Sequence, residues 1–238
     1  PLYSSAASDV YKRQAFGYRV NNQAAFQPVR YLHALAGFVA RQPGCALYQN
    51  TPVREYHDGD PCTLRTDDAV ITCRQIVLAT HSPLGIWLSL HTRLSPNRSY
   101  CLAIQTETEI PDGLFWDNED PYHYIRRVSS YDGHALVVGG ADHKTGADVD
   151  PEQHFAQVEE YCRERFGRFT VMRRWSAEYF NPADGLPYIG AHPKFPHSYF
   201  ALGFGGNGIT FSVTAARVIC EALRGGQPEE LEWYRFGR

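Results

Sequence analysis

A glycine-rich run near the C-terminal end has the residue types and spacing of an anion-binding loop. Gly203, Gly205 and Gly208 satisfy the pattern G-x-G-x-x-G. The run follows an apolar, strand-like segment, residues 198–202, and opens a helix-like segment, residues 209–223. At such a junction, backbone N–H groups and the start of a helix receive an anion or a polarised oxygen. We therefore predict that this loop contacts a cofactor.

The position of the run argues against a complete dinucleotide-binding unit. Such a unit places a second strand and an acidic residue about 20 positions after its glycines. Only residues 209–238 follow Gly208, and they contain no strand-like segment of this kind. A nicotinamide-dependent dehydrogenase is therefore the weaker interpretation of the loop.

Composition narrows the class of protein. With 238 residues, of which 43% are hydrophobic and 21% charged, the chain is expected to form one or two ordinary globular domains. A net charge of −3 predicts no binding of nucleic acid. Six scattered cysteines lack C-x-x-C spacing, and we expect free thiols, hence a cytoplasmic protein, rather than a disulfide set. No apolar run approaches the roughly 18 residues of a membrane span.

The histidines do not have the spacing of metal ligands. His143, His192 and His197 form no i, i+4 pair, so we predict no metal site. His123 is a candidate for the substrate side, with a packed or exposed role as the alternative.

The elements that must position the loop are read from periodicity. Helices are predicted over residues 26–42, 151–166 and 209–223. Strands are predicted over residues 51–56, 62–66, 69–73, 76–79, 100–108, 122–128, 135–139, 171–179 and 198–202. The run 76–79 is apolar at every position, which indicates a strand covered on both faces. A β, α, β order with an inserted antiparallel region predicts a two-lobed, mixed α/β and α+β architecture.

The first residues differ from the rest of the chain. Residues 1–14 show no helical or strand periodicity and resemble a translated adapter sequence. We expect them to be a non-native tail, and the chain to be a fragment of a longer protein.

Several segments, in this order, resemble one family. They are residues 76–81 (IVLATH), 122–126 (YHYIR), 138–146 (VGGADHKTG), 184–190 (DGLPYIG) and 203–208 (GFGGNG). Together they resemble the FAD-dependent oxidoreductases of the D-amino-acid oxidase and glycine oxidase superfamily. The likeness is greatest to the branch that often carries a C-terminal Rieske module, and it runs from about Phe26 to the C-terminus.

The resemblance implies a fold and a function. It implies an incomplete FAD-binding, Rossmann-like domain formed by residues 15–98 and 181–238, and an antiparallel substrate domain formed by residues 99–180. The cofactor would be FAD. The reaction would be hydride removal from a C–H next to an amine or hydroxyl of a small substrate, such as an amine, amino acid or hydroxy compound. An electron-transfer partner is a further expectation.

The resemblance also implies site residues. The flavin ring would meet the glycine loop, the ribityl chain the turn that precedes residue 186, and the ADP half the end of the strand at residues 76–79. The expected cofactor-binding residues are Val53, Ala79, Thr80, Asp184, Gly185, Gly205, Gly206, Asn207, Gly208 and Ile209. Tyr124 and Arg126 are the expected pocket residues on the substrate side.

Two departures from the family pattern leave alternatives open. The N-terminal G-x-G-x-x-G unit is absent from this chain, so a cofactor-free remnant or a protein-binding module is the competing interpretation. The arginine that holds a substrate carboxylate is also missing, with Phe180 near its place. Arg126, Arg127 or Arg174 would have to substitute for it.

Overall fold

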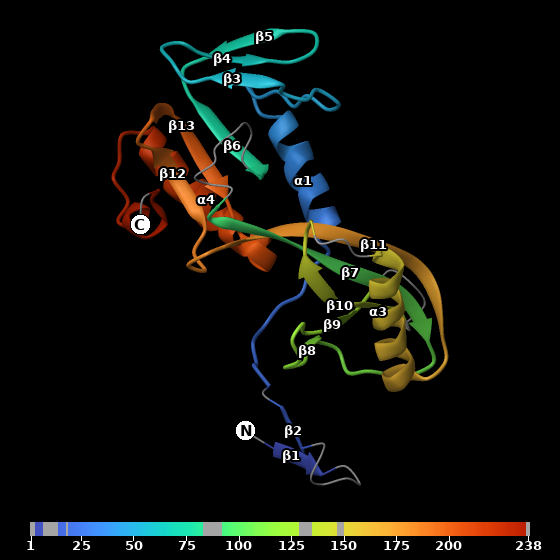
Figure 1. The fold of residues 1–238 in the computed structure, drawn as a ribbon. Helices are drawn as coiled ribbons and strands as arrows, with labels where there is room; N and C mark the ends of the chain where they lie inside the picture. The colour runs from blue at the N-terminus through green and yellow to red at the C-terminus, as the bar shows by residue number, and fades with distance from the viewer. Residues whose placement is uncertain are drawn as a thin grey trace. The chain divides into compact units, whose positions relative to one another are not determined.

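A computed structural model describes residues 3–6, 14–17, 19–82, 92–128, 135–146 and 150–236 (Figure 1). The chain forms two compact units, Pro1–Tyr48 and Gln49–Arg238.

The described residues of the first unit form two short strands and one helix. Strands β1 (Tyr3–Ala6) and β2 (Gln14–Gly17) pair antiparallel, although the sequence predicted no regular structure before residue 15. The difference arises because hairpin pairing is made by backbone groups and needs no apolar periodicity. Residues 1–2 and 7–13 of the predicted tail lie outside the described residues. Helix α1 (Pro28–Ala40) begins with proline at N1, as predicted.

A five-stranded antiparallel sheet dominates the second unit. Its strand order is β11-β7-β10-β9-β8. The strands are β7 (Leu94–Thr106), β8 (Leu114–Trp116), β9 (Tyr124–Arg127), β10 (Ala135–Lys144) and β11 (Phe169–Pro182). This confirms the predicted antiparallel region, and both β7 and β11 are longer than their apolar alternation indicated.

Helix α3 (Pro151–Phe166) covers one face of this sheet. It begins and ends where predicted, because Asp150 accepts a hydrogen bond from the N–H of Glu152 and Gly167 leaves the helix at φ 68°. The core between helix and sheet consists of buried side chains from both. They include Leu102, Ile104, Leu136 and Val138 from the sheet and Phe155, Val158 and Cys162 from the helix.

A second sheet has the order β12-β13-β6 and contains a parallel pair. Its strands are β6 (Ile76–His81), β12 (Tyr188–His192) and β13 (Phe195–Leu202). Helix α4 (Gly208–Leu223) packs on one face through Ala215, Val218 and Ile219, and the short α5 (Glu230–Tyr234) follows it. The prediction that residues 76–79 are covered on both faces is wrong for this chain. Ile76 and Leu78 are buried, but Val77 is 47% exposed because β6 is an edge strand whose two faces are packed differently.

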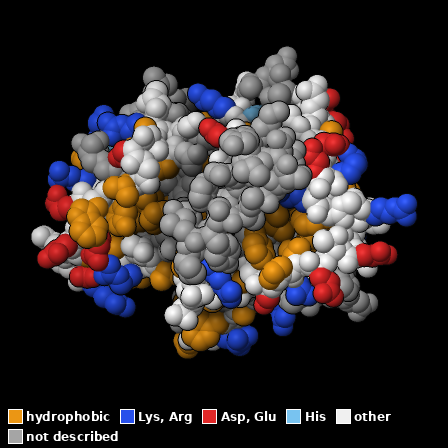
Figure 2. Space-filling model, turned by 90° about the horizontal axis from the view of Figure 1, so that it is seen from below, with side chains coloured by type: hydrophobic (Ala, Val, Ile, Leu, Met, Phe, Trp, Pro, Cys, Tyr) orange, Lys and Arg blue, Asp and Glu red, His pale blue; other side chains and the backbone are white. Residues whose placement is uncertain are grey.

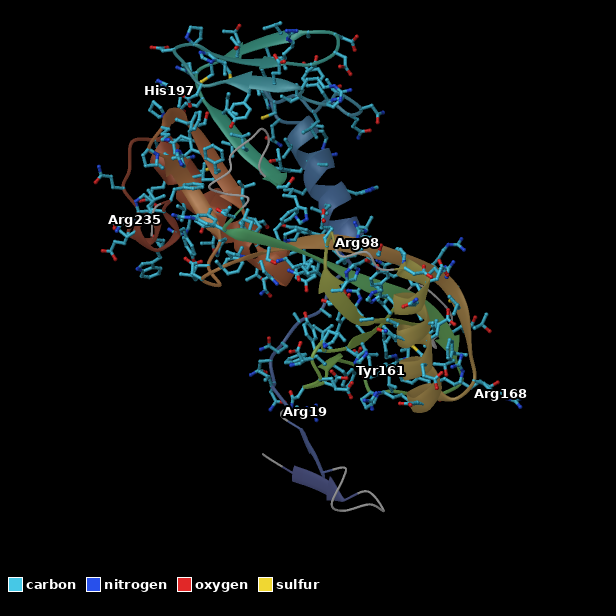
Figure 3. All side chains as sticks on the ribbon, viewed as in Figure 1. Arg19, Arg98, Tyr161, Arg168, His197 and Arg235 are labelled. Carbon is cyan, nitrogen blue, oxygen red and sulfur yellow. The ribbon has the colours of Figure 1, made fainter. Side chains whose placement is uncertain are left out.

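A third sheet is a small antiparallel meander. It contains β3 (Glu55–His57), β4 (Cys62–Arg65) and β5 (Val70–Cys73). Asp58 ties it to the first residues of β13: its carboxylate accepts hydrogen bonds from the N–H of His197 (3.1 Å) and the hydroxyl of Ser198 (2.6 Å). Figure 3 shows His197 at the end of β13 that faces this sheet.

Large apolar side chains are also exposed at several places. Figure 2 shows hydrophobic side chains interspersed with charged ones on one face of the molecule. The four most exposed large apolar side chains in α1 are those of Val29, Leu32, Leu35 and Phe38, which are 44–59% exposed. No helix among the described residues is both long and apolar enough to cross a membrane.

Candidate functional site

The glycine loop lies at the carboxyl ends of the parallel strands β6 and β13. The register pairs Leu202, the last residue of β13, with His81 of β6. Gly203 follows with φ 72°, and a Cβ there would lie 2.6 Å from Cδ2 of Leu94 and 3.8 Å from Cβ of Pro182. Only glycine fits this close approach of backbone to side chains. The loop is thus placed where open α/β sheets bind their ligands.

The loop then turns directly into α4. Residues Gly205–Asn207 form a short 3₁₀ turn, η1, in which Gly205 adopts φ 54°, and a Cβ there would lie 2.8 Å from the Asn181 amide oxygen. Among the described residues, no side chain caps the first turn of the 16-residue helix α4. Its N–H groups and the positive end of its dipole therefore suit an oxygen acceptor on a ligand. A carbonyl oxygen of a flavin ring is an acceptor of this kind.

The Asp184–Gly185 turn is beside this loop. Gly185 has φ 77°, and its N–H donates to the carbonyl of Pro182 (3.1 Å). The Asp184 carboxylate accepts from the N–H of Leu186 (3.2 Å). Because Pro182 also approaches Gly203, the structure brings the turn and the glycine loop together.

The end of β6 meets β11. Ala79 and Thr80 are exposed, and the Thr80 hydroxyl donates to the carbonyl of Ser82 (2.6 Å). The next residue, His81, donates from Nε2 to the carbonyl of Glu178 (3.0 Å) and packs edge-on against the ring of Phe180. Phe180, which stands near the place of the missing arginine, is therefore a packing residue.

Val53 lies apart from the other expected residues. It is half-buried in the segment that precedes β3 of the small meander. That meander joins β13 at Ser198, at the opposite end of the strand from the glycine loop. Its expected contact with adenine stays a prediction.

Tyr124 occupies the sheet face opposite α3. Its hydroxyl contacts the Ser99 hydroxyl (3.1 Å) and the Cys101 sulfur (3.0 Å). Burial, together with the neighbouring Cys101, raises the pKa of Tyr124, so its phenol stays protonated and able to donate. The neighbouring Tyr122 ring, 6.1 Å away, carries its hydroxyl towards the glycine loop, 3.9 Å from the position of a Cβ on Gly206. The sheet face that carries Tyr122 and Tyr124, here called the tyrosine face, is thus adjacent to the glycine loop.

The structure separates the three candidate arginines by sheet face. Arg126 and Tyr124 alternate on β9 and share a face, whereas Arg127 lies on the other face, beside Leu136. Arg174 contacts Glu152 (2.6 Å) and the ring of Phe155, both on α3. Arg126 is therefore the arginine that shares the tyrosine face.

Close packing beneath Tyr124 supports a first prediction. A Cβ on Gly139 would overlap the Tyr124 ring. We expect Gly139→Ala to lower the free energy of unfolding by about 1–3 kcal/mol, since the ring or the strand must move. Urea denaturation measures this. Combining the change with Tyr124→Ala should cost less than the sum of the two single changes; strict additivity would contradict the overlap.

An ionic cluster lies on the other side of β9. Ligand atoms of Asp117, Glu119 and His123 lie within 4.8 Å of one another. The Arg165 guanidinium is 3.9 Å from the Asp117 carboxylate and 3.8 Å from that of Glu119, and the His123 ring stacks on Tyr161 at 3.8 Å. Because arginine already supplies the positive charge, we interpret the cluster as a salt-bridge network and assign no metal to it. His123 is packed here and lies on the opposite side of β9 from Tyr124.

The cluster gives a pH-dependent prediction. Burial by itself raises the pKa of Asp117. Hydrogen bonds from the backbone N–H of His123 (2.8 Å) and from its imidazole (3.0 Å) outweigh this effect and hold the pKa below its usual range. A carboxyl whose pKa is lower in the folded state stabilises the fold above its unfolded pKa of about 3.9, and this stability is lost as the pH falls through the folded pKa. We expect Asp117→Asn to be destabilising at pH 6.5, and the difference from wild type to shrink below about pH 4.

Urea denaturation between these pH values tests the prediction. The exposed Asp112→Asn variant is the control. A destabilisation by Asp117→Asn that is equal at every pH would show that the carboxylate charge is not responsible.

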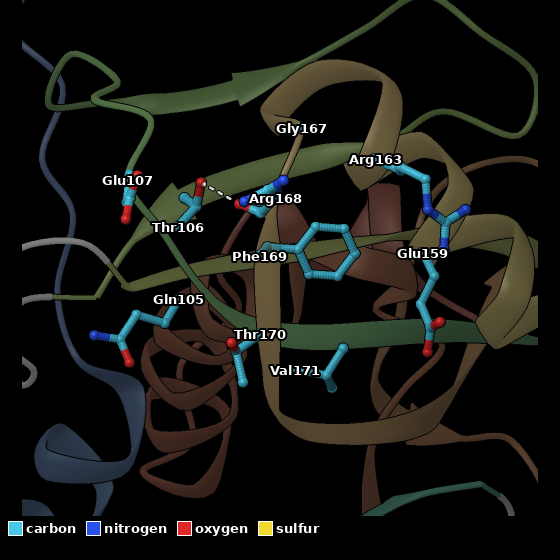
Figure 4. Close-up of a pocket in the computed structure, with 10 residues that line it drawn as sticks. All are labelled: Gln105, Thr106, Glu107, Glu159, Arg163, Gly167, Arg168, Phe169, Thr170 and Val171. Atoms are coloured by element: carbon cyan, nitrogen blue, oxygen red, sulfur yellow. Dashed lines mark hydrogen bonds between the residues drawn. The ribbon is translucent and has the colours of Figure 1, made fainter.

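An open pocket elsewhere contains none of the predicted site residues. It has a volume of about 1110 Å³ and lies where α3 meets β11, at the end of the sheet farther from the glycine loop (Figure 4). Two of its lining residues are joined by a hydrogen bond from the Thr106 hydroxyl to the Arg168 carbonyl (3.3 Å). We assign the site to the glycine loop and the tyrosine face, where the backbone donors and phenols converge.

The sequence did not single out three polar residues of this region. Asp142, Tyr179 and Asn181 connect β10 and β11 to Gly205. The available signal was the Gly139-Gly140 pair just before Asp142, which marks a bulge or a close approach in a strand.

A glycine-rich loop with open backbone donors beside a tyrosine-lined sheet can hold a cofactor next to a small-molecule site. A model of the DAO family, FAD-dependent oxidoreductases, matches residues 5–222. The chain therefore belongs to this family of FAD-dependent oxidoreductases.

Individual relatives agree with this assignment. The chain is 26% identical over 207 residues to the putative Rieske 2Fe-2S iron-sulfur protein YhfW of Bacillus subtilis, covering 86% of this chain and 40% of that protein. It is 22% identical to the glycine oxidase of Bacillus subtilis, covering 77% of this chain and 50% of that protein. The glycine oxidase structure from Geobacillus kaustophilus has the same fold, with a TM-score of 0.72 and 19% identity over 87% of this chain and 57% of that one. The chain thus spans about half the length of these relatives.

Proposed function

We propose that the protein to which this chain belongs removes a hydride from a carbon next to an amine or hydroxyl group of a small substrate. A bound flavin supplies the hydride acceptor. The observation that carries the proposal is the adjacency of Tyr122, on the tyrosine face, to Gly206, in the glycine loop. Substrate and cofactor sites that meet there place the two reactants in contact.

Each group of this chain has a role in the proposal. Residues Gly205–Ile209 would donate backbone N–H groups and the dipole of α4 to the flavin ring, and Asp184-Gly185 would border the ribityl chain. Ala79, Thr80 and Val53 would border the ADP half. Tyr124 would donate a hydrogen bond from a protonated phenol, and Arg126 would attract a substrate carboxylate on the same face.

The proposal extends to domains, location and partner. Residues 15–98 and 181–238 would form part of the FAD-binding domain and residues 99–180 the substrate domain. The six free thiols suit a cytoplasmic setting. The likeness to a Rieske protein supports an electron-transfer partner as the destination of the electrons.

Flavin spectroscopy on the full-length protein tests the function. We expect the purified protein to show flavin absorbance. Anaerobic addition of at least one compound from a panel of small amines and a hydroxy acid should bleach this absorbance. The panel contains glycine, L-proline and iminodiacetate, the compounds named for structural neighbours, with glycolate as the hydroxy analogue of glycine. A protein without flavin, even after incubation with FAD, would contradict the proposal and favour a cofactor-free remnant.

A further inference from the structure

A buried β-bulge in β10 turns the carboxylate of Asp142 out of the regular alternation of the strand. The pairing of β10 with β7 shifts register between Gly140 and His143. Within this bulge Ala141 has φ 54°, a left-handed conformation that is costly for alanine, and it is 3% exposed. The His154 ring on α3 donates from Nδ1 to the Ala141 carbonyl (2.8 Å) and holds the bulge in place. Bulges next to functional sites commonly redirect a side chain, and here that side chain is Asp142.

The Asp142 carboxylate is only half satisfied. The Tyr179 hydroxyl donates to Oδ2 at 2.7 Å. The other oxygen, Oδ1, is buried, and no described group hydrogen-bonds to it. A buried carboxylate oxygen without a donor is costly, so the site is built to receive one.

The carboxylate is also connected to the glycine loop. The Asn181 side chain interacts with the Tyr179 hydroxyl, and the Asn181 amide oxygen lies 2.8 Å from the position of a Cβ on Gly205. Asp142, Tyr179 and Asn181 therefore form a polar connection from β10 to the loop that would border the flavin.

The groups around Asp142 are neutral donors. Burial raises the pKa of Tyr122, Tyr124 and Tyr179, and in each case the negative charge of Asp142 contributes to the rise. The phenols therefore add no second negative charge. Tyr122 is 46% exposed, so this face of the sheet is open to solvent beside Asp142.

We propose that Oδ1 of Asp142 accepts a hydrogen bond from a protonated amine nitrogen of the ligand bound between the tyrosine face and the glycine loop. An ammonium group supplies both the missing donor and the opposite charge, whereas a hydroxyl supplies only a donor. The inference rests on the proposed function and adds to it a residue that selects amines over hydroxy compounds. Asp142 positions the substrate nitrogen and takes its proton before the hydride leaves, because only the neutral amine can form the C=N bond. Tyr179 and Asn181 hold the carboxylate.

Binding of methylammonium to the full-length protein tests the inference without turnover. Tetramethylammonium, which has the same charge but no N–H, is the matched ligand. Two signals are followed: the absorbance of the flavin and the near-ultraviolet difference spectrum of tyrosine. We expect saturable changes with methylammonium alone. Asp142→Asn should weaken this binding by about 10- to 100-fold, as for hydrogen bonds to charged groups, while the exposed Asp112→Asn leaves it unchanged.

A second variant covers the case in which Asp142→Asn does not fold. Tyr179→Phe keeps the carboxylate and removes its described donor, so it should change the methylammonium dissociation constant at least threefold. Three outcomes would overturn the inference: no response of the wild type, equal responses to the two cations, or unaltered binding in folded Asp142→Asn. The tyrosine signal separates this from failure of the proposed function, because a protein without flavin still reports binding at Asp142.

Discussion

Replacing Gly205 with alanine is expected to lower the flavin content of the purified full-length protein about tenfold. Gly205 has φ 54°, a conformation that costs a non-glycine residue about 1–2 kcal/mol, so the loop of the alanine variant relaxes away from it and flavin binding must restore it. Each 1.4 kcal/mol is a factor of ten in binding. In addition, the new Cβ would lie 2.8 Å from the Asn181 amide oxygen and displace it. The 3₁₀ turn that presents the backbone donors would then lose its shape.

Another glycine of the chain provides a matched control. Gly225 has φ 86°, and no heavy atom of the described residues lies within 4 Å of the position that a Cβ would occupy, so Gly225→Ala reproduces the backbone strain away from the loop. Flavin content, measured as the ratio of flavin to protein absorbance, should be unchanged in this variant. A normal ratio in Gly205→Ala would show that the loop does not hold the cofactor.

Truncating Leu102 to alanine should cause a large loss of stability, about 3 kcal/mol within the 2–5 kcal/mol range of such changes. Leu102 is 0% exposed in the core between β7 and α3, beside Val138 and Val158. The change removes buried methyl groups and leaves a cavity that the neighbouring strands fill only in part, since β7 is paired on both sides.

Chemical denaturation of the same protein measures this loss. Val171→Ala on β11 is a suitable control because Val171 is 37% exposed and should cost well under half as much. Equal losses in the two variants would mean that the interface between helix and sheet is not a principal source of stability.

The sequence predicted best those elements whose ends are fixed by local chemistry. Helix α3 was predicted at both ends: Asp150 and Pro151 are local start signals, and Arg163 and Arg165 are basic residues suited to a last turn. Strands β8 and β12 and helix α5 were not predicted, since they are short and are formed by pairing or packing with distant segments. The end of β7 at Leu94 was missed for the same reason: its pairing with Pro182 extends the strand beyond its apolar alternation.

The sequence singled out the segments of the candidate site, but not how their side chains are arranged. The glycine loop, the Asp184 turn and the end of β6 do converge, because parallel strands bring their carboxyl ends to one edge. Choosing Arg126 over Arg174 required the register of β9 and the contacts of α3. The role of Asp142 depends on a bulge, and a one-residue change of register reverses the face of every later side chain.

The parallel pairing of β6 with β13 has a consequence for biosynthesis. Ile76 pairs with Ser198, and the entire five-stranded sheet and α3 are encoded between them. During translation β6 therefore leaves the ribosome well before β13. Their pairing is a long-range contact that can form only after the intervening sheet and helix have been synthesised, and such non-local pairing is intrinsically slow.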